Sequence, residues 1–206
     1  MLFSSNVLDS TSTIVELGCG ISALNALCLD GAVAEYVLTD QPYVARLVAQ
    51  NLAANRKSNN HDNDNDNNTV ARRVVRRGPA RTALRTAVRF VMLDWERNDA
   101  ASAVPQRGAD VVLACDCVYN DALVRPLVDT CADVCRVRDE AGGSMTVCVV
   151  AQQLRHADVF AMWMEAALEK FRVWRVPEEK LPEALQPQSG LVVHVAVLRV
   201  GDISDR

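Results

Sequence analysis

The sequence predicts a single α/β domain in which an open, mostly parallel sheet of seven strands is covered by helices on both faces. Two observations lead to this prediction. Apolar runs alternate with amphipathic helical stretches five times along the chain, which is typical of a parallel sheet with crossover helices. The chain then closes with two apolar runs joined by a polar, proline-containing loop, which indicates a strand pair with one reversed strand at the sheet edge. Together these features define a Rossmann-like fold.

Strands are expected where apolar residues run without interruption, because the strands of a parallel sheet are buried on both faces. The seven expected strands are Thr13 to Leu17, Glu35 to Thr39, Val88 to Leu93, Asp110 to Cys115, Ser144 to Ala151, Val173 to Val176 and Leu191 to Val200.

Helices are expected where apolar residues recur every three or four positions. The first should end before Gly31, because glycine often follows the last helical residue, and the second should begin at Pro42. The four expected helices are Ser22 to Asp30, Pro42 to about Lys57, Asp121 to Val137 and Ala157 to Phe171. The positions expected to face the sheet from the first two are Leu24, Leu27 and Cys28, then Val44, Leu47, Val48 and Leu52.

Composition limits the class of protein. The 206 residues suit one domain, residues 1–206, and the net charge of −4 argues against a general nucleic-acid binder. No apolar run is long enough to span a membrane, and the N-terminus lacks a secretory signal pattern. The seven cysteines, most of them inside apolar runs, are typical of reduced core thiols. We therefore expect a cytoplasmic or nuclear monomer.

A stretch of biased composition interrupts the alternation at residues 58–86. Its first part is rich in Asn and Asp, without an apolar anchor, and is expected to be a disordered insertion. Seven arginines follow, from Arg72 to Arg89, and contact with nucleic acid is expected only through them, if they are more than a solvated surface.

A glycine turn after the first strand points to an adenosine-containing cofactor. Gly18 and Gly20 allow a tight turn and close approach of the backbone to a ligand. Asp40 lies about twenty residues further on, at the tip of the second strand, where a carboxylate can accept both ribose hydroxyls. Glu16 would repel a pyrophosphate but tolerate a cationic sulfonium, which favours S-adenosylmethionine over a dinucleotide.

Two further strand tips carry residues suited to such a site. Trp95 can stack on adenine while Asp94 accepts from the adenine amino group. Asp116 and Tyr119 follow the fourth strand, where they could hold an amine in line with a methyl group. No metal site is expected, because the cysteine pairs lack zinc-site spacing and the three histidines are scattered.

These tips resemble those of the seven-strand methyltransferases, and among them the protein lysine methyltransferases with an Asp-x-x-Tyr motif. The matching pieces are Val15-Glu16-Leu17-Gly18-Cys19-Gly20, Thr39-Asp40-Gln41, Leu93-Asp94-Trp95-Glu96 and Ala114-Cys115-Asp116-Cys117-Val118-Tyr119-Asn120. Downstream pieces are similar to the fungal ribosomal lysine N-methyltransferase 5 group: Thr130-Cys131-Ala132-Asp133, Val150-Ala151-Gln152-Gln153-Leu154-Arg155, Phe171-Arg172-Val173-Trp174-Arg175-Val176-Pro177 and Ser189-Gly190-Leu191-Val192-Val193-His194.

The resemblance implies methylation of a lysine on a large-subunit ribosomal protein, with the stalk protein uL-one as the first candidate. It implies that Asp116 and Tyr119 frame the acceptor lysine. It also implies a set of cofactor-lining residues: Gly18, Cys19, Gly20, Asp40, Trp95, Ala114 and Cys115.

One departure from the family concerns the segment before the first strand. The family carries there a tryptophan and a helix that closes over the cofactor, whereas about a dozen residues precede the first strand here. We therefore expect a missing lid and a cleft open to solvent. A non-catalytic binding module stays open as an alternative, as does a lysine methyltransferase acting on a chaperone or an elongation factor. A nicotinamide-dependent oxidoreductase is disfavoured, since none of the three lysines falls near a strand tip.

Overall fold

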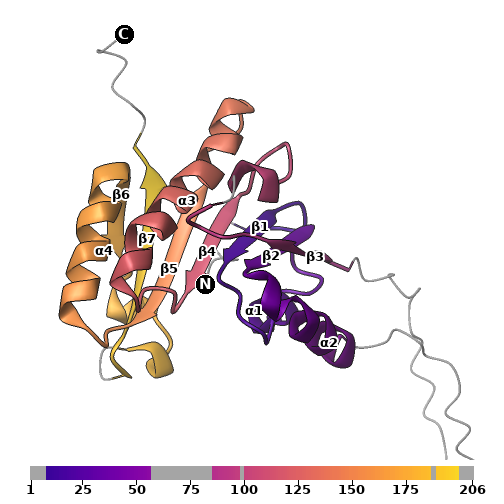
Figure 1. Ribbon diagram of the computed structural model, residues 1–206, viewed down its shortest axis with the longest axis horizontal. Helices are drawn as coiled ribbons and strands as arrows, with labels where there is room; N and C mark the ends of the chain where they lie inside the picture. Colours follow the sequence, from indigo (N-terminus) through magenta and orange to yellow (C-terminus); the bar gives the residue numbers. More distant parts are fainter. Residues whose placement is uncertain (1–7, 57–84, 98–99, 187–188, 200–206) are drawn as a thin grey trace, which may run out of the picture.

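The structure is a computed structural model that describes residues 8–56, 85–97, 100–186 and 189–199. Seven strands form one sheet in the order β3-β2-β1-β4-β5-β7-β6 (Figure 1). The strands are β1 (Thr13–Leu17), β2 (Glu35–Asp40), β3 (Ala87–Met92), β4 (Val111–Cys115), β5 (Val147–Gln153), β6 (Phe171–Arg175) and β7 (Leu191–Leu198). The α-helices are α1 (Leu24–Cys28), α2 (Ala45–Asn55), α3 (Asp121–Glu140) and α4 (Ala157–Lys170).

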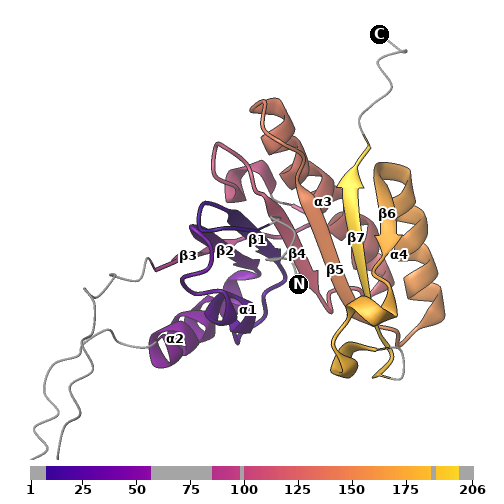
Figure 2. The same cartoon turned by 180° about the vertical axis from the view of Figure 1, so that it is seen from behind.

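The strand directions confirm the predicted fold class. Strands β1 to β5 pair in parallel, and β7 runs antiparallel to both of its neighbours, β5 and β6. The reversed strand therefore lies one place in from the edge, between β5 and β6, rather than at the edge itself (Figure 2). The reason is that β7 pairs along its length with both β5 and β6.

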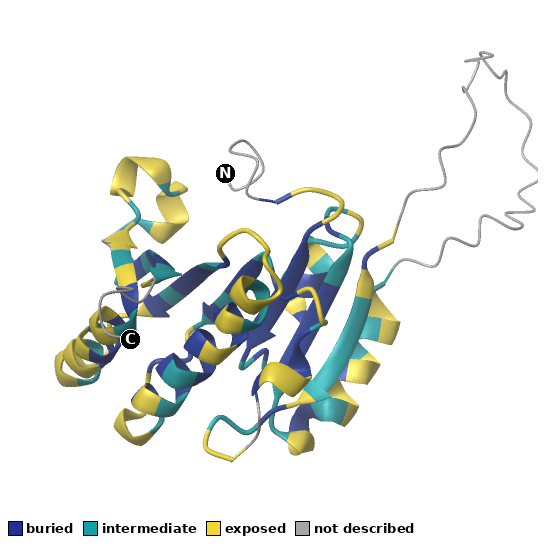
Figure 3. Cartoon of the chain, turned by 90° about the horizontal axis from the view of Figure 1, so that it is seen from above, coloured by how far each residue is buried: buried dark blue, intermediate teal, exposed yellow. Residues whose placement is uncertain are grey.

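Two apolar cores lie on the two faces of the sheet, because neighbouring residues of a strand point to opposite faces. On one face, residues such as Val15 and Leu17 of β1 pack with the buried side of α3 and with Trp163 of α4. On the other face, Ile14 and Tyr36 pack with small residues around α1 and α2. Figure 3 shows the buried residues along the central strands and the exposed residues on the outer sides of the helices.

The first helix is shorter than expected and buries a different side chain, whereas the second begins at Pro42 as expected, with a 3₁₀ turn (Pro42–Val44) that leads into α2. In α1 the buried residue is Ala26, whereas Leu24 is 62% exposed. Of the four positions expected to face the sheet from the second helix, Val44 and Val48 are buried, Leu52 packs against the same core, and Leu47 is exposed. The small side chains of Ala23 and Ala26 pack against the sheet at the first helix, where the larger Leu24 is exposed.

The expected insertion at 58–86 lies outside the described residues except for Arg85 and Thr86. Thr86 is part of the fold rather than of a solvated loop, which corrects the upper boundary of the insertion. Its side chain is buried and accepts a hydrogen bond from the Gly31 amide at 2.8 Å. Arg56, on the other side of the span, donates to the Thr86 carbonyl at 2.5 Å and pairs with Asp30. The two ends of the span are therefore joined by direct contacts.

Strand β3 differs from the buried strand that its apolar sequence predicts. It lies at an edge of the sheet, and most of its residues are only half-buried. Leu93, the residue after the strand, is buried. Within the described part of the chain, no helix is long and apolar enough to cross a lipid bilayer.

Candidate active site

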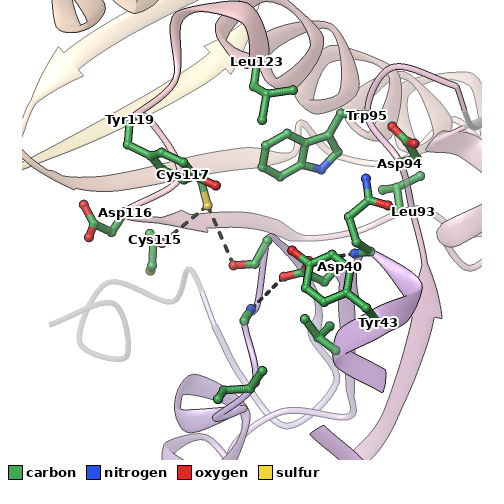
Figure 4. Close-up of a pocket in the computed structure, with 15 residues that line it drawn as sticks. Asp40, Tyr43, Leu93, Asp94, Trp95, Cys115, Asp116, Cys117, Tyr119 and Leu123 are labelled. Carbon is green, nitrogen blue, oxygen red and sulfur yellow. Dashed lines mark hydrogen bonds between the residues drawn. The ribbon is translucent and has the colours of Figure 1, made fainter. Parts of the chain in front are cut away.

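A cleft of about 480 Å³ opens at the carboxyl ends of β1, β2, β3 and β4 (Figure 4). Parallel α/β sheets bind their ligands at this edge, and the volume is typical of a small-molecule site. Eight of the eleven residues predicted for the site line the cleft: Gly18, Gly20, Asp40, Asp94, Trp95, Cys115, Asp116 and Tyr119.

The glycine turn after β1 forms the floor of the cleft. Gly18 and Gly20 both have positive φ angles, +67° and +61°, which L side chains rarely adopt. A Cβ at Gly18 would lie 2.9 Å from Cys117 Sγ and 3.1 Å from the Trp95 ring. A Cβ at Gly20 would meet nothing within 4 Å. A glycine is therefore required at position 18 because Cys117 and Trp95 pack closely against it, whereas the space beside Gly20 is open.

Asp40, at the end of β2, stabilises this turn through hydrogen bonds. Its Oδ2 accepts a hydrogen bond from the Gly20 amide at 2.8 Å, and its Oδ1 accepts from the Gln41 amide at 2.7 Å. The Cys19 amide donates to the Thr39 carbonyl at 3.0 Å, so two consecutive residues at the end of β2 hold the turn. The carboxylate still lines the cleft, where its remaining lone pairs can accept from a ligand.

Trp95 forms a wall of the cleft after β3. Its indole ring lies against Gly18, and its Nε1 is buried without a hydrogen-bond partner among the described residues. Asp94 beside it accepts from the Glu96 amide at 3.0 Å and also lines the cleft (Figure 4). An aromatic face and a carboxylate thus adjoin one another, as recognition of a purine ring with an amino group requires.

Asp116 marks the mouth of the cleft after β4. It adopts a positive φ of 56°, which is uncommon for a residue with a side chain. Its amide donates to the Ala151 carbonyl at 2.7 Å. Arg155 donates two hydrogen bonds to its carboxylate, at 2.8 Å and 2.7 Å. Figure 4 shows this carboxylate turned away from Asp40 and Trp95, while Tyr119 lies exposed at the same mouth.

Three predicted site residues do not line the cleft: Glu16, Cys19 and Ala114. Glu16 is buried behind it, where Asn25 donates to one carboxyl oxygen at 2.7 Å and the Tyr36 hydroxyl donates to the other at 2.8 Å. Burial raises the pKa of Glu16, although both hydrogen bonds oppose the rise. We expected the Glu16 side chain to face the ligand directly, but it does not line the cleft. Successive residues of β1 point to opposite faces of the sheet, and Glu16 points toward Asn25 and Tyr36.

Sequence reasoning missed seven lining residues: Ile21, Gln41, Tyr43, Val44, Leu93, Cys117 and Leu123. The Cys117 thiol is buried and donates to the Leu17 carbonyl at 3.1 Å. Burial also raises the pKa of Cys115 to about 11, so this thiol stays protonated at neutral pH. Their position in the sequence could have identified some of them, because several of the seven lie within two residues of a predicted site residue at the end of a strand.

His194 lies away from the cleft and belongs to the core. It packs 5.1 Å from the Trp163 ring, and burial lowers its pKa. Among the described residues, no group of three or more His, Cys, Asp or Glu side chains could hold a metal ion.

Comparison with known proteins adds a family match. A family model described as lysine methyltransferase matches residues 66–166. This span contains Trp95, Asp116 and Tyr119 but neither the glycine turn nor Asp40. No curated protein matches the chain.

Solved structures with a similar fold are methyltransferases by name in two of three examples. A methyltransferase from Pyrococcus furiosus superposes with a TM-score of 0.53 at 12% identity, over 96% of this chain and 79% of its own. The YcgJ protein from Bacillus subtilis gives 0.56 at 10% identity, over 97% of both chains. The CurJ carbon methyltransferase gives 0.53 at 15% identity over 93% of this chain, which spans 50% of that one.

At these identities the likeness shows the fold alone. It is the seven-strand fold of class I methyltransferases, which confirms the fold predicted from the sequence. Another structure with this fold is named a TehB-like SAM-dependent methyltransferase from Corynebacterium glutamicum; it superposes with a TM-score of 0.50 at 12% identity, over 96% of this chain and 84% of its own.

Proposed function

We propose that this chain is an S-adenosylmethionine-dependent protein-lysine N-methyltransferase. The observation that carries the proposal is one cleft in which the glycine turn, Asp40, Trp95 and the Asp116–Tyr119 segment come together. The family match over residues 66–166 supports lysine as the acceptor.

The residues of the cleft fit an adenosyl cofactor. Positive φ angles and the absence of a Cβ keep the floor open at Gly20. In the proposal Asp40 binds the ribose hydroxyls, because its carboxylate is fixed by two amides and lines the cleft. The Trp95 ring borders the adenine, with Asp94 as acceptor for its amino group.

The mouth of the cleft suits a protein side chain as acceptor. When bound, the cofactor supplies an electrophilic methyl group on a sulfonium. Tyr119 is 57% exposed and Asp116 is also exposed, so a long side chain can reach them from solvent. Holding the acceptor amine in line with the methyl group is the main contribution that these residues can make.

The acceptor that we propose is a lysine of a large-subunit ribosomal protein, with the stalk protein uL-one first. Support comes from the similarity of the downstream segments, including Ala151-Gln152-Gln153-Leu154-Arg155, to the fungal ribosomal lysine N-methyltransferase 5 group. Two of these segments have structural roles here: Arg155 contacts Asp116, and the Leu154 amide donates to the Gly190 carbonyl at 2.8 Å.

The first test is calorimetric titration of the full chain with S-adenosylhomocysteine. Micromolar binding is expected if the cleft holds the cofactor. Absence of binding by a folded sample would refute the proposal and favour a non-catalytic module.

The acceptor is tested next with radiolabelled S-adenosylmethionine and separated ribosomal proteins. Label on a lysine of uL-one is expected. Label on a chaperone or an elongation factor instead would keep the enzyme class and replace the substrate.

A further inference from the structure

The carboxylate at the mouth of the cleft is already paired with a cation. Arg155 follows β5 and binds both oxygens of Asp116 in a bidentate arrangement. Asp116 Oδ1 also accepts from the Gln153 amide at 3.3 Å. The left-handed backbone conformation of Asp116, and the hydrogen bond that its amide donates to the Ala151 carbonyl, direct the carboxylate toward the end of β5. The pairing is therefore built into the backbone at two strand ends.

The charged surroundings leave Arg155 as the cation that contacts Asp116 in the described part of the chain. The other titratable groups that line the cleft are Asp40 at the end of β2, Tyr43, Asp94 after β3, Cys115 at the end of β4, and Cys117 and Tyr119 after it. Glu16 of β1 lies buried behind the cleft. Asp121 begins α3, His156 precedes α4 and Asp158 lies in the first turn of α4. Most of these are acidic or neutral. The hydrogen bonds to Asp116 raise the pKa of Arg155, so its guanidinium stays charged.

We propose that Arg155 is a positioning residue that cancels the charge of Asp116, so that the acceptor amine can lose its proton to bulk water near neutral pH. The inference rests on the proposed function, since it concerns the amine that enters beside Tyr119. An unpaired carboxylate beside a lysine favours the ammonium form, which has no lone pair for attack on a methyl group. Pairing with Arg155 removes this penalty while leaving the carboxylate at the mouth as a hydrogen-bond acceptor.

The solvent exposure of the ion pair limits how strongly Arg155 can change the pKa of the acceptor amine. The side chains of Arg155 and Asp116 are 44% and 46% exposed, so solvent screens the pair. Loss of the guanidinium is therefore expected to increase the affinity for the ammonium form of a bound amine by about fivefold, which corresponds to a rise of about 0.7 in the pKa of that amine.

The test uses a bisubstrate amine as probe, in which a short aminoalkyl arm replaces the methyl group of the cofactor. Its affinity and that of S-adenosylhomocysteine are measured by calorimetry between pH 6 and 9 for several variants. We expect R155M and R155Q to bind the amine about fivefold more tightly at pH 7. Their affinity for S-adenosylhomocysteine should equal that of the wild type.

Three controls separate charge from structure. R155K keeps the cation and should behave as the wild type. The double variant D116N/R155M lacks both charges and should lose the gain. R125M removes a second exposed bidentate arginine, paired with Glu169 outside the cleft, and should change neither affinity.

Two results would overturn the inference in distinguishable ways. If S-adenosylhomocysteine binds normally and both neutral variants bind the amine as the wild type does, the charge role of Arg155 is wrong and the proposed function stands. If the folded wild type binds neither compound, the proposed function fails and this inference fails with it.

Discussion

Asp40 illustrates how one residue can serve the fold and the site together. It holds the glycine turn through the Gly20 amide and presents the same carboxylate to the cleft. We expect Asp40→Ala to weaken binding of S-adenosylhomocysteine by about a hundredfold or more, because hydrogen bonds to a charged group contribute about 1.5–3 kcal/mol each. Calorimetric titration measures the change.

A control on the same strand is available for this variant. Glu35 lies at the opposite end of β2 and pairs with Arg89 at 2.9 Å. Glu35→Ala should leave the affinity unchanged. Equal affinities for Asp40→Ala and the wild type would show that the ribose lies elsewhere.

Glu16 predicts a pH dependence of stability. Its pKa is raised in the folded state from the ordinary value of 4.5, mainly by burial, so the folded protein binds this proton more tightly than the unfolded chain does. Stability from this group is therefore fully present below pH 4.5 and is lost as the pH rises through the folded pKa.

Glu16→Gln removes this titration. The free energy of unfolding of the variant, measured with urea at several pH values, should fall less than that of the wild type as pH rises above 4.5. Parallel pH profiles for the two proteins would mean that Glu16 does not titrate with a raised pKa.

At the scale of elements, the turn between β1 and α1 separates two effects of adding a side chain to a glycine: backbone strain at a positive φ angle, and a steric clash of the new Cβ. Gly18→Ala combines a positive φ with a Cβ 2.9 Å from Cys117 Sγ, whereas Gly20→Ala has the positive φ and open space. In both variants the strained backbone should lower the free energy of unfolding by about 1–2 kcal/mol, and in Gly18→Ala the clash should lower it further.

Thermal unfolding and cofactor titration distinguish the two variants. Gly18→Ala should have the lower melting temperature. Gly20→Ala should be closer to the wild type in melting temperature yet bind S-adenosylhomocysteine less well, since its Cβ enters the space left for the ligand. The proposed floor of the site would be wrong if Gly20→Ala bound normally.

The elements also show what a single sequence can and cannot predict. Apolar runs located all seven strands, and tip residues such as Asp40 and Trp95 were found because parallel strands bring their carboxyl ends together. Periodicity misplaced Leu24 and Leu47, because it identifies an apolar stripe without showing whether smaller neighbours already cover the sheet. The ion pair of Asp116 with Arg155 joins residues far apart in the chain, so no local pattern could indicate it.

At the scale of the whole molecule, the span between α2 and β3 separates two ends that contact each other. Replacing residues 58–84 by a short Gly/Ser linker should leave the melting temperature within a few degrees of the wild type, because Arg56 and Thr86 already join the ends. Thr86→Val should lower the free energy of unfolding by about 1–3 kcal/mol, since the Val33 carbonyl would lose the donor of a buried hydrogen bond and the Gly31 amide would lose its acceptor.

Thermal and urea unfolding of the two variants provide the measurement. A large loss of stability in the deletion variant would show that the span packs on the domain. An unchanged Thr86→Val variant would show that the hydroxyl network around Leu29, Gly31 and Val33 contributes little.

The place of β7 has a consequence for the order in which the sheet can assemble during synthesis. β6 pairs with β7 and with no other described strand, although it leaves the ribosome before β7 does. Until residues 191–198 emerge, β6 has no partner and the outer side of β5 is an open edge that can recruit strands from other chains. Ribosome-stalled chains that end before residue 191 should therefore depend on chaperones, and once β7 emerges it should pair with β5 and β6 together and leave β6 as the edge strand.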